Sequence, residues 1–482
     1  MPNKTKHNPS SFYEQFPFIP LAFLICFLYW MYIACIAQMV IADDSIGYER
    51  LGYLLNEKGW HEYWRTGPFR EPFYPFLVSL SVGLSQNLHL SYQTIQLFIQ
   101  LFILFITQCL MLNILKKLRI HPLLCAFSIL YLGISPAIIN STVILYSEIA
   151  SYPFVLSLII LNVHLWKLLT RPVLESRFHQ KKIMLYALGL GLNFTLATFA
   201  RAIFESMTPF LLLPYFILPS IQKNPVQRKN TLMAILVCLM AFYVPVVSYK
   251  LMNKKYNNHF TLMEHGSKAL YGQTARRMQE LTPRRFMAAL AFVPNWRFCL
   301  NFFSDQECRD WSFIPSDDFG VKKKSELEKS LTPTKVDLAL IRFSAHEALQ
   351  NPWQYMLLMG VESLKMFFWE EATSQYVIFP KNIIKVYSFK PFSVGLKWLS
   401  ALLTFMSLIY LGIVNWRNRK DILSGASREG PTFILFYIFI LICFFIFVHS
   451  FFYILPRYIL PIVSLYLIAF AHLLQSVFFK TK

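Results

Sequence analysis

Two acidic residues follow directly after the first long apolar segment of the chain. Asp43 and Asp44 stand in the stretch Ile41-Ala42-Asp43-Asp44-Ser45-Ile46-Gly47-Tyr48, and the segment before them, Phe18 to Ile41, contains no charge. Carboxylates are costly near hydrocarbon, so this pair marks either a functional site or the boundary with water. A carboxylate in that position could accept a proton from an attacking hydroxyl or amine.

Three further charged residues stand at the edges of apolar segments. Glu148 begins one segment, Arg201 lies between two others, and Arg457 opens the final one. Guanidinium groups bind phosphate bidentately and stay charged, so the arginines suit a phosphorylated ligand. Each residue also has a structural interpretation. Glu148 could favour a helix N-terminus, Arg201 could snorkel to water, and Arg457 could anchor a span among lipid headgroups.

Long apolar segments are the elements that must position these groups. Of the 482 residues, 55% are hydrophobic and 15% are charged, against about a quarter charged in soluble domains. Val82 to Leu115 and Phe433 to Pro456 carry no charge. Because runs of about 18 or more apolar residues form membrane spans, the sequence predicts an all-α integral membrane protein. The first run is too long for a signal peptide and no small-residue cleavage site follows it, so we expect an uncleaved span.

Basic clusters set the predicted topology, because Lys and Arg stay in cytoplasmic loops. The clusters are Lys4/Lys6, Lys116/Lys117/Arg119, Lys167 to Lys182, Lys223/Arg228/Lys229, Arg417/Arg419/Lys420 and Lys480/Lys482. They predict ten spans: 17–41, 91–115, 122–142, 146–166, 183–200, 203–221, 231–251, 397–415, 432–452 and 457–478. Segments 73–84 and 355–369 fit interfacial helices in the first and the large external loops. If they cross instead, the total rises within a range of about 10–13 transmembrane helices and part of the orientation inverts.

This topology divides the chain into three parts. Residues 1–251 form an N-terminal transmembrane module whose first external loop, 42–90, holds the acidic pair. Residues 252–396 form a large external loop with short and amphipathic helices, and residues 397–482 form the C-terminal transmembrane helices.

Other classes of function find little support in the sequence. The net charge of +20 lies mostly in short loops, where topology and anionic lipid explain it, so we expect no nucleic-acid partner. No cysteine pair has metal-ligand spacing. Cys299 and Cys308 are the only two cysteines outside the apolar segments. They could form a disulfide if the large loop faces an oxidising compartment, or could be ordinary buried thiols.

These features together resemble the C-type membrane glycosyltransferases (GT-C superfamily). The nearest resemblance is to the bacterial family 39 proteins, which include the lipid A aminoarabinose transferase and are related to protein O-mannosyltransferases. The resemblance is carried by Asp44-Ser45 with Tyr48, by Arg70-Glu71-Pro72-Phe73-Tyr74-Pro75, by Tyr146-Ser147-Glu148, by Ala200-Arg201-Ala202, and by Pro456-Arg457-Tyr458 with Pro461. Glu71 departs from the lysine of many relatives, and Ser464 stands where a second proline is common.

The resemblance implies an inverting glycosyltransferase that takes a sugar from a polyprenyl-phosphate donor. The acceptor would be a lipid, glycan or protein at the external, periplasmic face of a bacterial inner (plasma) membrane. Asp44, with Asp43 as the alternate, would be catalytic; Arg70, Arg201, Arg457 and Tyr458 would bind the donor phosphate and lipid; Tyr48, Glu71 and Glu148 would bind acceptor or sugar. Some members use a divalent cation and others do not, and the sequence leaves both open. The alternatives are a polytopic transporter or flippase and a polysaccharide ligase for lipid-linked glycans, and a transporter would more often hold its charges near mid-span.

Overall fold

The structure is a computed structural model that describes residues 17–67, 70–170, 177–222, 224–263, 266–279, 281–371, 376–419 and 431–479. The basic residues Lys4, Lys6, Lys223, Lys420, Lys480 and Lys482 lie outside the described residues. Within this part of the chain nearly every element is a helix. The only strands there are β1 (Gln38–Met39) and β2 (Val377–Ile378), each two residues long.

Nine of the described helices are long and apolar enough to cross a membrane. They are α2 (Phe18–Ile36), α5 (Tyr92–Lys117), α8 (Glu148–Thr170), α9 (Arg177–Ala200), α10 (Ile203–Ile221), α11 (Pro225–Asn257), α21 (Lys390–Arg417), α23 (Pro431–Ser450) and the continuous pair η2 (Pro456–Ile462) and α24 (Val463–Phe478). A tenth span is possible from α6 (Pro122–Ile134) and α7 (Pro136–Val143), which are bent by 47°. The predicted class, an all-α integral membrane protein, is confirmed.

The described residues give nine spans, and they reach ten, the lower end of the predicted range, if the bent pair α6 and α7 is one span. Each of the ten predicted spans overlaps one of these helices, although the third is broken at Ser135, where Pro136 starts a new helix. The two segments that could have raised the count form α4 (Phe73–Leu88) and α19 (Pro352–Lys365), with 16 and 14 residues. A span needs about 20 residues to cross 30 Å of hydrocarbon, so neither is long enough.

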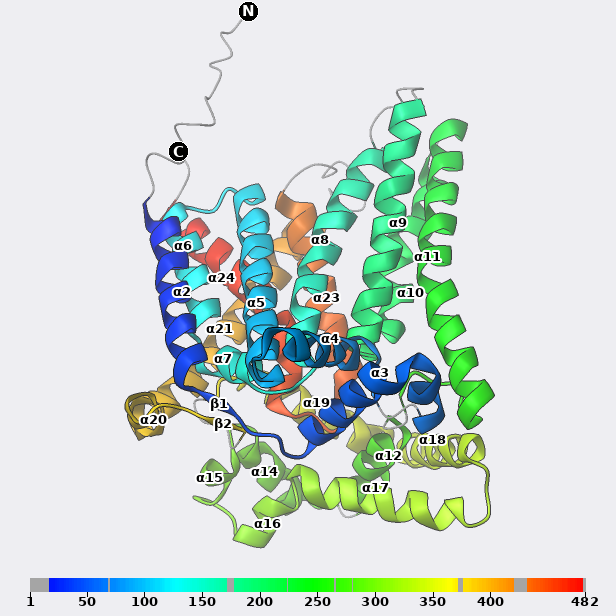
Figure 1. Cartoon of the computed structure of the whole chain (residues 1–482), viewed down its shortest axis with the longest axis vertical. Helices are drawn as coiled ribbons and strands as arrows, with labels where there is room; N and C mark the ends of the chain where they lie inside the picture. The colour runs from blue at the N-terminus through cyan, green and yellow to red at the C-terminus, as the bar shows by residue number, and fades with distance from the viewer. Residues whose placement is uncertain are drawn as a thin grey trace, which may run out of the picture.

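Two helices lie across one end of the bundle, α3 (Asp44–Thr66) and α4, as Figure 1 shows. They pack closely on one another because Gly52 has no side chain: a Cβ there would lie 2.4 Å from Cγ1 of Val78. Gly59 adopts φ 72° and bends α3, a conformation that costs little only for glycine. The first helix after the acidic pair is therefore held against the bundle rather than extending from it.

A second layer of helices covers the same end of the bundle (Figure 1). It consists of α12 (Gly266–Tyr271), the π-helix η1 (Gly272–Arg276), α13 (Arg277–Gln279), α14 (Pro283–Phe292), α15 (Trp296–Cys299), α16 (Asp305–Arg309), α17 (Phe313–Glu328), α18 (Pro333–Gln350), α19 and α20 (Lys381–Ser388). A disulfide joins Cys299 to Cys308, with Cα atoms 5.9 Å apart, which confirms the predicted pairing. Trp311, Leu358 and neighbouring apolar side chains form a small core beneath it.

A buried charged cluster fastens this layer to the bundle. The Glu362 carboxylate accepts hydrogen bonds from Arg277 at 2.6 Å and from Lys365 at 2.8 Å. Its other oxygen accepts the backbone N–H of Ile454, which lies three residues before Arg457, at 3.0 Å. All three charged side chains are at most 3% exposed, and the cation of Arg277 also faces the rings of Trp311 and Tyr453. Buried charges of this kind are tolerated only when they are paired and hydrogen-bonded.

Candidate functional site

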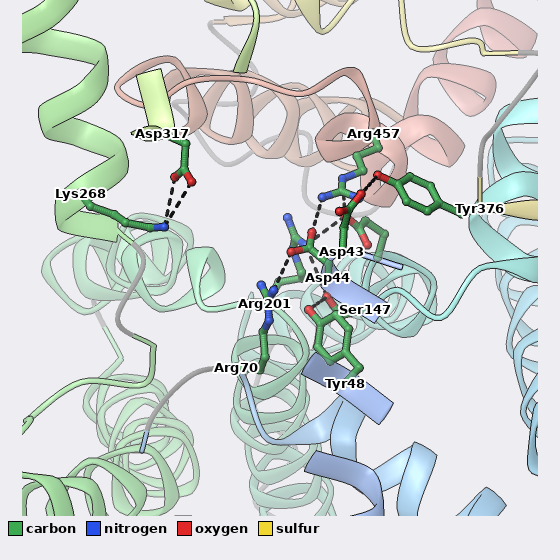
Figure 2. A network of polar contacts seen from close by, with 11 residues as sticks. Asp43, Asp44, Tyr48, Arg70, Ser147, Arg201, Lys268, Asp317, Tyr376 and Arg457 are labelled. Carbon is green, nitrogen blue, oxygen red and sulfur yellow. Dashed lines mark hydrogen bonds and ion pairs between the residues drawn. The ribbon is translucent and has the colours of Figure 1, made fainter. Parts of the chain in front are cut away.

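Asp44 lies between two arginines from distant parts of the chain. Its Oδ1 atom accepts a hydrogen bond from Arg70 at 2.6 Å, and its Oδ2 atom accepts one from Arg457 at 2.5 Å (Figure 2). Asp44 starts α3, Arg70 lies between α3 and α4, and Arg457 lies on η2. The chain is not helical between the end of α23 at Ser450 and the start of η2 at Pro456. Arg457 therefore lies at the beginning of the last described span, where its guanidinium reaches Asp44 on α3.

A second carboxylate connects Arg457 to Arg201. The Glu148 Oε1 atom lies 3.2 Å from Arg201 Nη1 and 3.5 Å from Arg457 Nε. Glu148 starts α8, and Arg201 occupies the short connection between α9 and α10. Both groups are shielded, with Glu148 only 3% exposed. Two carboxylates and three guanidiniums thus form one continuous network.

Hydroxyl and aromatic groups complete this network. Tyr48 donates a hydrogen bond to Ser147 at 2.9 Å, and Arg201 donates one to the same oxygen at 3.4 Å. The guanidinium of Arg70 lies 5.1 Å from the centre of the Tyr48 ring, and that of Arg201 lies 5.2 Å from the Tyr458 ring. These rings hold the cations in place through cation–π contacts.

Glu71 binds the backbone next to Arg201 rather than a guanidinium group. Its Oε1 atom accepts the backbone N–H of Ala202 at 3.0 Å, and the side chain is 4% exposed. Glu71 therefore ties the connection between α3 and α4 to the connection that holds Arg201. This is a structural contact at the edge of the cluster, beside the arginine rather than in ion-pair contact with it.

Asp43 is bound to the large loop, and the ion pairs of the described residues include none between Asp43 and an arginine. Tyr376 donates a hydrogen bond to its Oδ2 atom at 2.6 Å. The backbone there is strained, with φ 49°, and the adjacent strand β1 pairs with β2, Gln38 opposite Ile378 and Met39 opposite Val377. This small ribbon fixes the residues that precede Asp44. The structure therefore separates the two acids, one among arginines and one beside a tyrosine.

The network controls the charge of its members. Burial alone would raise the pKa of Asp44, but Arg70 and Arg457 outweigh it and hold the pKa at about 2. Burial lowers the pKa of Arg201, and the nearby Glu148 more than offsets this, so the pKa lies above its usual value. Burial raises the pKa of the Tyr48 hydroxyl. Asp44 is consequently an anion and Arg201 a cation across the physiological range.

The structure has an apolar groove against α3 and α4 and a small pocket that shares residues with the cluster. A groove of about 480 Å³ lies between α3, α4, α9 and α11 and is almost wholly apolar; it is lined by Trp60, Trp64, Pro72, Phe73, Phe76, Leu196, Phe199, Pro245, Ser248, Tyr249 and Met252. A smaller pocket of about 80 Å³ has a mixed lining that includes Tyr146, Glu148, Tyr376 and Arg457. An apolar groove beside a charged cluster suits an amphipathic molecule with a hydrocarbon chain and a charged head.

All nine residues expected from the sequence lie in or beside this network. They are Asp43, Asp44, Tyr48, Arg70, Glu71, Glu148, Arg201, Arg457 and Tyr458. Sequence reasoning missed Tyr376, which comes from the large loop and carries no local motif. It quoted Tyr146 and Ser147 only as neighbours of Glu148, although the guanidinium of Arg457 lies 4.3 Å from the Tyr146 ring centre. In the described part of the chain, no group of three or more His, Cys, Asp or Glu side chains has the arrangement of a metal site.

The chain is thus a multi-pass α-helical membrane protein with a buried carboxylate–guanidinium cluster at one end of its bundle. No protein-family model and no curated protein matches it. Among solved structures it is similar to an archaeal oligosaccharyltransferase, AglB from Archaeoglobus fulgidus, determined in complex with an inhibitory peptide and a dolichol-phosphate. The match has 12% identity and a TM-score of 0.48, covering 92% of this chain and 47% of that one. The chain spans about half the length of that protein.

Proposed function

We propose that this protein is an inverting membrane glycosyltransferase of the GT-C class. It transfers a sugar from a polyprenyl-phosphate donor to a lipid, glycan or protein acceptor at the external, periplasmic face of a bacterial inner membrane. The observation that supports this most is the bonding of Asp44 to both Arg70 and Arg457 beside an apolar groove. The cluster combines a proton acceptor with cations for a phosphate, at the end of a membrane-spanning bundle.

The arginines supply the leaving-group side of the reaction. As the bond between the sugar carbon and the phosphate oxygen breaks, its electron pair passes to the phosphate, and fixed cations stabilise that charge. Phosphate binds guanidinium more strongly than a single carboxylate contact does, because it can accept two parallel hydrogen bonds. A donor phosphate can therefore displace Asp44 from Arg70 or Arg457, so that the carboxylate holds the arginines in place until the donor arrives.

Asp44 supplies the acceptor side. A pKa near 2 makes it a weak base while both arginines are bound. When Arg70 or Arg457 binds the donor phosphate instead of Asp44, the carboxylate loses one of its two cations. The pKa of Asp44 then moves back toward its ordinary value. The acceptor hydroxyl attacks the anomeric carbon from the face opposite the phosphate, and its proton passes to Asp44. One bond forms as the other breaks, so the configuration inverts and the polyprenyl phosphate leaves.

The apolar groove supplies a place for the hydrocarbon chain of a lipid substrate. Its residues Pro72 and Phe73 follow Arg70 and Glu71 directly in the sequence. A phosphate at Arg70 would thus have its chain directed along Trp60, Phe76 and Phe199. Burying aliphatic chain against these rings contributes about 25 cal/mol for each Å² removed from water.

The orientation of the site is part of the same proposal. Helices α3, α4 and the layer α12–α20 gather at one end of the bundle (Figure 1). The basic residues Lys116 and Lys117 lie in the last turn of α5, and Lys167 lies in the last turn of α8, at the opposite end of that helix from Glu148. The disulfide Cys299–Cys308 belongs to this layer, and such bonds persist in oxidising compartments. These features favour an external location for the cluster.

A transfer assay with the purified full chain in lipid nanodiscs tests the proposal. Undecaprenyl phosphate carrying radiolabelled glucose, galactose or mannose is incubated with membrane lipid and peptide acceptors, and labelled product is measured. We expect product formation that falls about 100-fold or more in Asp44→Asn. Asp317→Asn is the matched control, because Asp317 pairs with Lys268 at 3.1 Å outside the cluster (Figure 2) and should keep full activity.

Other outcomes are equally informative. Full activity in Asp44→Asn with loss in Asp43→Asn would move the catalytic assignment by one residue. Activity in both variants would reject an acidic base. Movement of a labelled lipid across the bilayer of proteoliposomes without any transfer would reject the enzyme in favour of a transporter.

A further inference from the structure

The small pocket beside Arg457 is enclosed by segments that are far apart in the sequence. Its walls come from α7, from the turn that leads into α8, from η2, and from Trp369, Glu371 and Tyr376 of the large loop. Its volume, about 80 Å³, exceeds the roughly 10–15 Å³ that one water molecule requires. The lining consists of Ala137, Asn140, Ser141, Ile144, Tyr146, Glu148, Trp369, Glu371, Tyr376, Arg457 and Leu460.

Two buried polar groups in this wall lack hydrogen-bond partners among the described residues. Asn140 donates from its amide nitrogen to the backbone oxygen of Glu371 at 2.9 Å, but its Oδ1 atom accepts nothing there. The Tyr146 hydroxyl makes no hydrogen bond of ordinary geometry within this part of the chain, and its polar neighbours there are Tyr376 and Arg457. Asn140 is 5% exposed and Tyr146 is 4% exposed. Buried groups of this kind are nearly always satisfied, so their position in a cavity indicates a polar ligand.

The residues of the wall determine which hydrogen-bonding groups the ligand must carry. The amide oxygen of Asn140 needs a hydrogen-bond donor, whereas the Tyr146 hydroxyl can donate or accept. The guanidinium of Arg457 in the same wall can bind a phosphate, but a fully ionised phosphate offers no donor to the amide oxygen of Asn140. Ala137, Trp369 and Leu460 add apolar surface to this otherwise polar wall. A ring that carries hydroxyl groups at its edge and C–H groups on its face satisfies both requirements.

We infer that this pocket receives one edge of the transferred sugar, with Asn140 and Tyr146 bound to hydroxyl groups of a neutral monosaccharide. The inference rests on the proposed function and names the sugar subsite of that same centre. Arg457 connects the two regions, because it lines the pocket and also donates to Asp44. A sugar held by Asn140 and Tyr146 would therefore place its phosphate bond toward the arginines.

Binding measurements separate this inference from the proposed function. The full chain in nanodiscs is titrated with undecaprenyl phosphate, and in parallel with undecaprenyl phosphate linked to glucose, galactose or mannose. We expect at least one sugar-linked lipid to bind about tenfold more tightly than the bare lipid phosphate. Tyr146→Phe, which keeps the ring beneath Arg457, should reduce that sugar-dependent gain to about threefold or less and leave the affinity for the bare lipid unchanged.

Two further variants complete the experiment. Asn140→Leu should also remove the gain, and Tyr437→Phe is the control, because the Tyr437 hydroxyl bonds to Leu211 away from the pocket. The inference is overturned if all three sugar-linked lipids bind like the bare lipid phosphate, or if Tyr146→Phe and Asn140→Leu both keep the full gain. The pocket would then hold water only. Failure of the bare lipid phosphate to bind wild-type protein would instead overturn the proposed function.

Discussion

Asp44 and Arg457 stand 413 positions apart in the chain, yet their side chains meet at 2.5 Å. Arg457 also lies 3.5 Å from Glu148, so one guanidinium connects the first acid of α3 with the first acid of α8. A contact of this kind depends on the planar group of arginine, which has five donors in a fixed geometry. Several consequences can be measured.

Arg457→Lys should lower transfer activity at least tenfold. An ammonium is a compact point charge, and it cannot bridge Asp44 and Glu148 or bind phosphate bidentately as the guanidinium does. The measurement is the initial rate of transfer in nanodiscs at saturating donor. Arg417→Lys, at the last turn of α21, makes the same chemical change elsewhere and should leave the rate unaltered. Equal rates for both variants would show that the bridging geometry is unimportant.

The contribution of Asp44 to stability should disappear in acid. Its folded pKa, about 2, lies below the ordinary value of 3.8, so the stabilisation is complete above about pH 4 and is lost as the pH falls toward 2. The shift sets an upper limit of about 2 kcal/mol, which solvent screening reduces because the side chain is 33% exposed. Thermal unfolding of wild type and Asp44→Asn should differ at pH 7 and converge near pH 2. A difference that persists at low pH would contradict the ion-pair explanation.

Breaking the buried cluster around Glu362 should destabilise the layer α12–α20. In Glu362→Gln the cations of Arg277 and Lys365 lose their counter-charge, and removing one partner of a buried pair costs about 3–5 kcal/mol. The readout is the unfolding temperature, together with the rate of protease cleavage within residues 266–365. Glu307→Gln removes the partner of Arg284, whose side chain is 74% exposed, and should change neither by much. Comparable losses in the two variants would show that burial does not matter here.

The disulfide gives a simple count of thiols. The chain contains eight cysteines, and two of them are joined, so alkylation of the denatured protein without reductant should add six groups and alkylation after reduction should add eight. Mass spectrometry of the intact protein reads both numbers. In the chain-entropy model, closing this short loop contributes about 2–3 kcal/mol, so reduction should also lower the unfolding temperature. Eight groups without reductant would rule out the bond in the mature protein.

Labelling from either side of the membrane tests the orientation. By sequence, position 118 lies in a predicted cytoplasmic loop and position 320 in the large external loop, so both would be labelling sites. In the structure, however, Leu118 is only 4% exposed, and a Cβ at Gly320 would lie 2.5 Å from the Lys268 carbonyl oxygen. Exposed residues expected on the same two sides are better probes: Gln180→Cys for the cytoplasmic side and Lys322→Cys for the external side. An impermeant maleimide added to intact cells should react only at 322. Reaction of both positions from one side would reject the predicted topology.

The sequence was sufficient to predict the helices because membrane spans are encoded locally, by length and hydrophobicity. It also singled out Asp44, Arg201 and Arg457, because charge at the edge of an apolar segment is conspicuous. The partners of these residues could not be deduced. Only the resemblance favoured Asp44 over Asp43; in the structure the two differ because Asp43 is bound by Tyr376 and Met39 pairs with Val377. The break between α6 and α7, which exposes Asn140 to the small pocket, was likewise hidden within one apolar segment.

The position of Arg457 in the chain also has a consequence for biosynthesis. It lies on η2, which follows every other described span, whereas Asp44 follows the first of them. Ribosomes add about 5–20 residues per second, so the 413 positions between these residues correspond to roughly 20–80 s of synthesis. During that interval Asp44 has Arg70 but not Arg457. The nascent protein can insert most of its helices before the centre is complete, and any chemistry that needs Arg457 begins only after the span carrying it has left the translocation machinery.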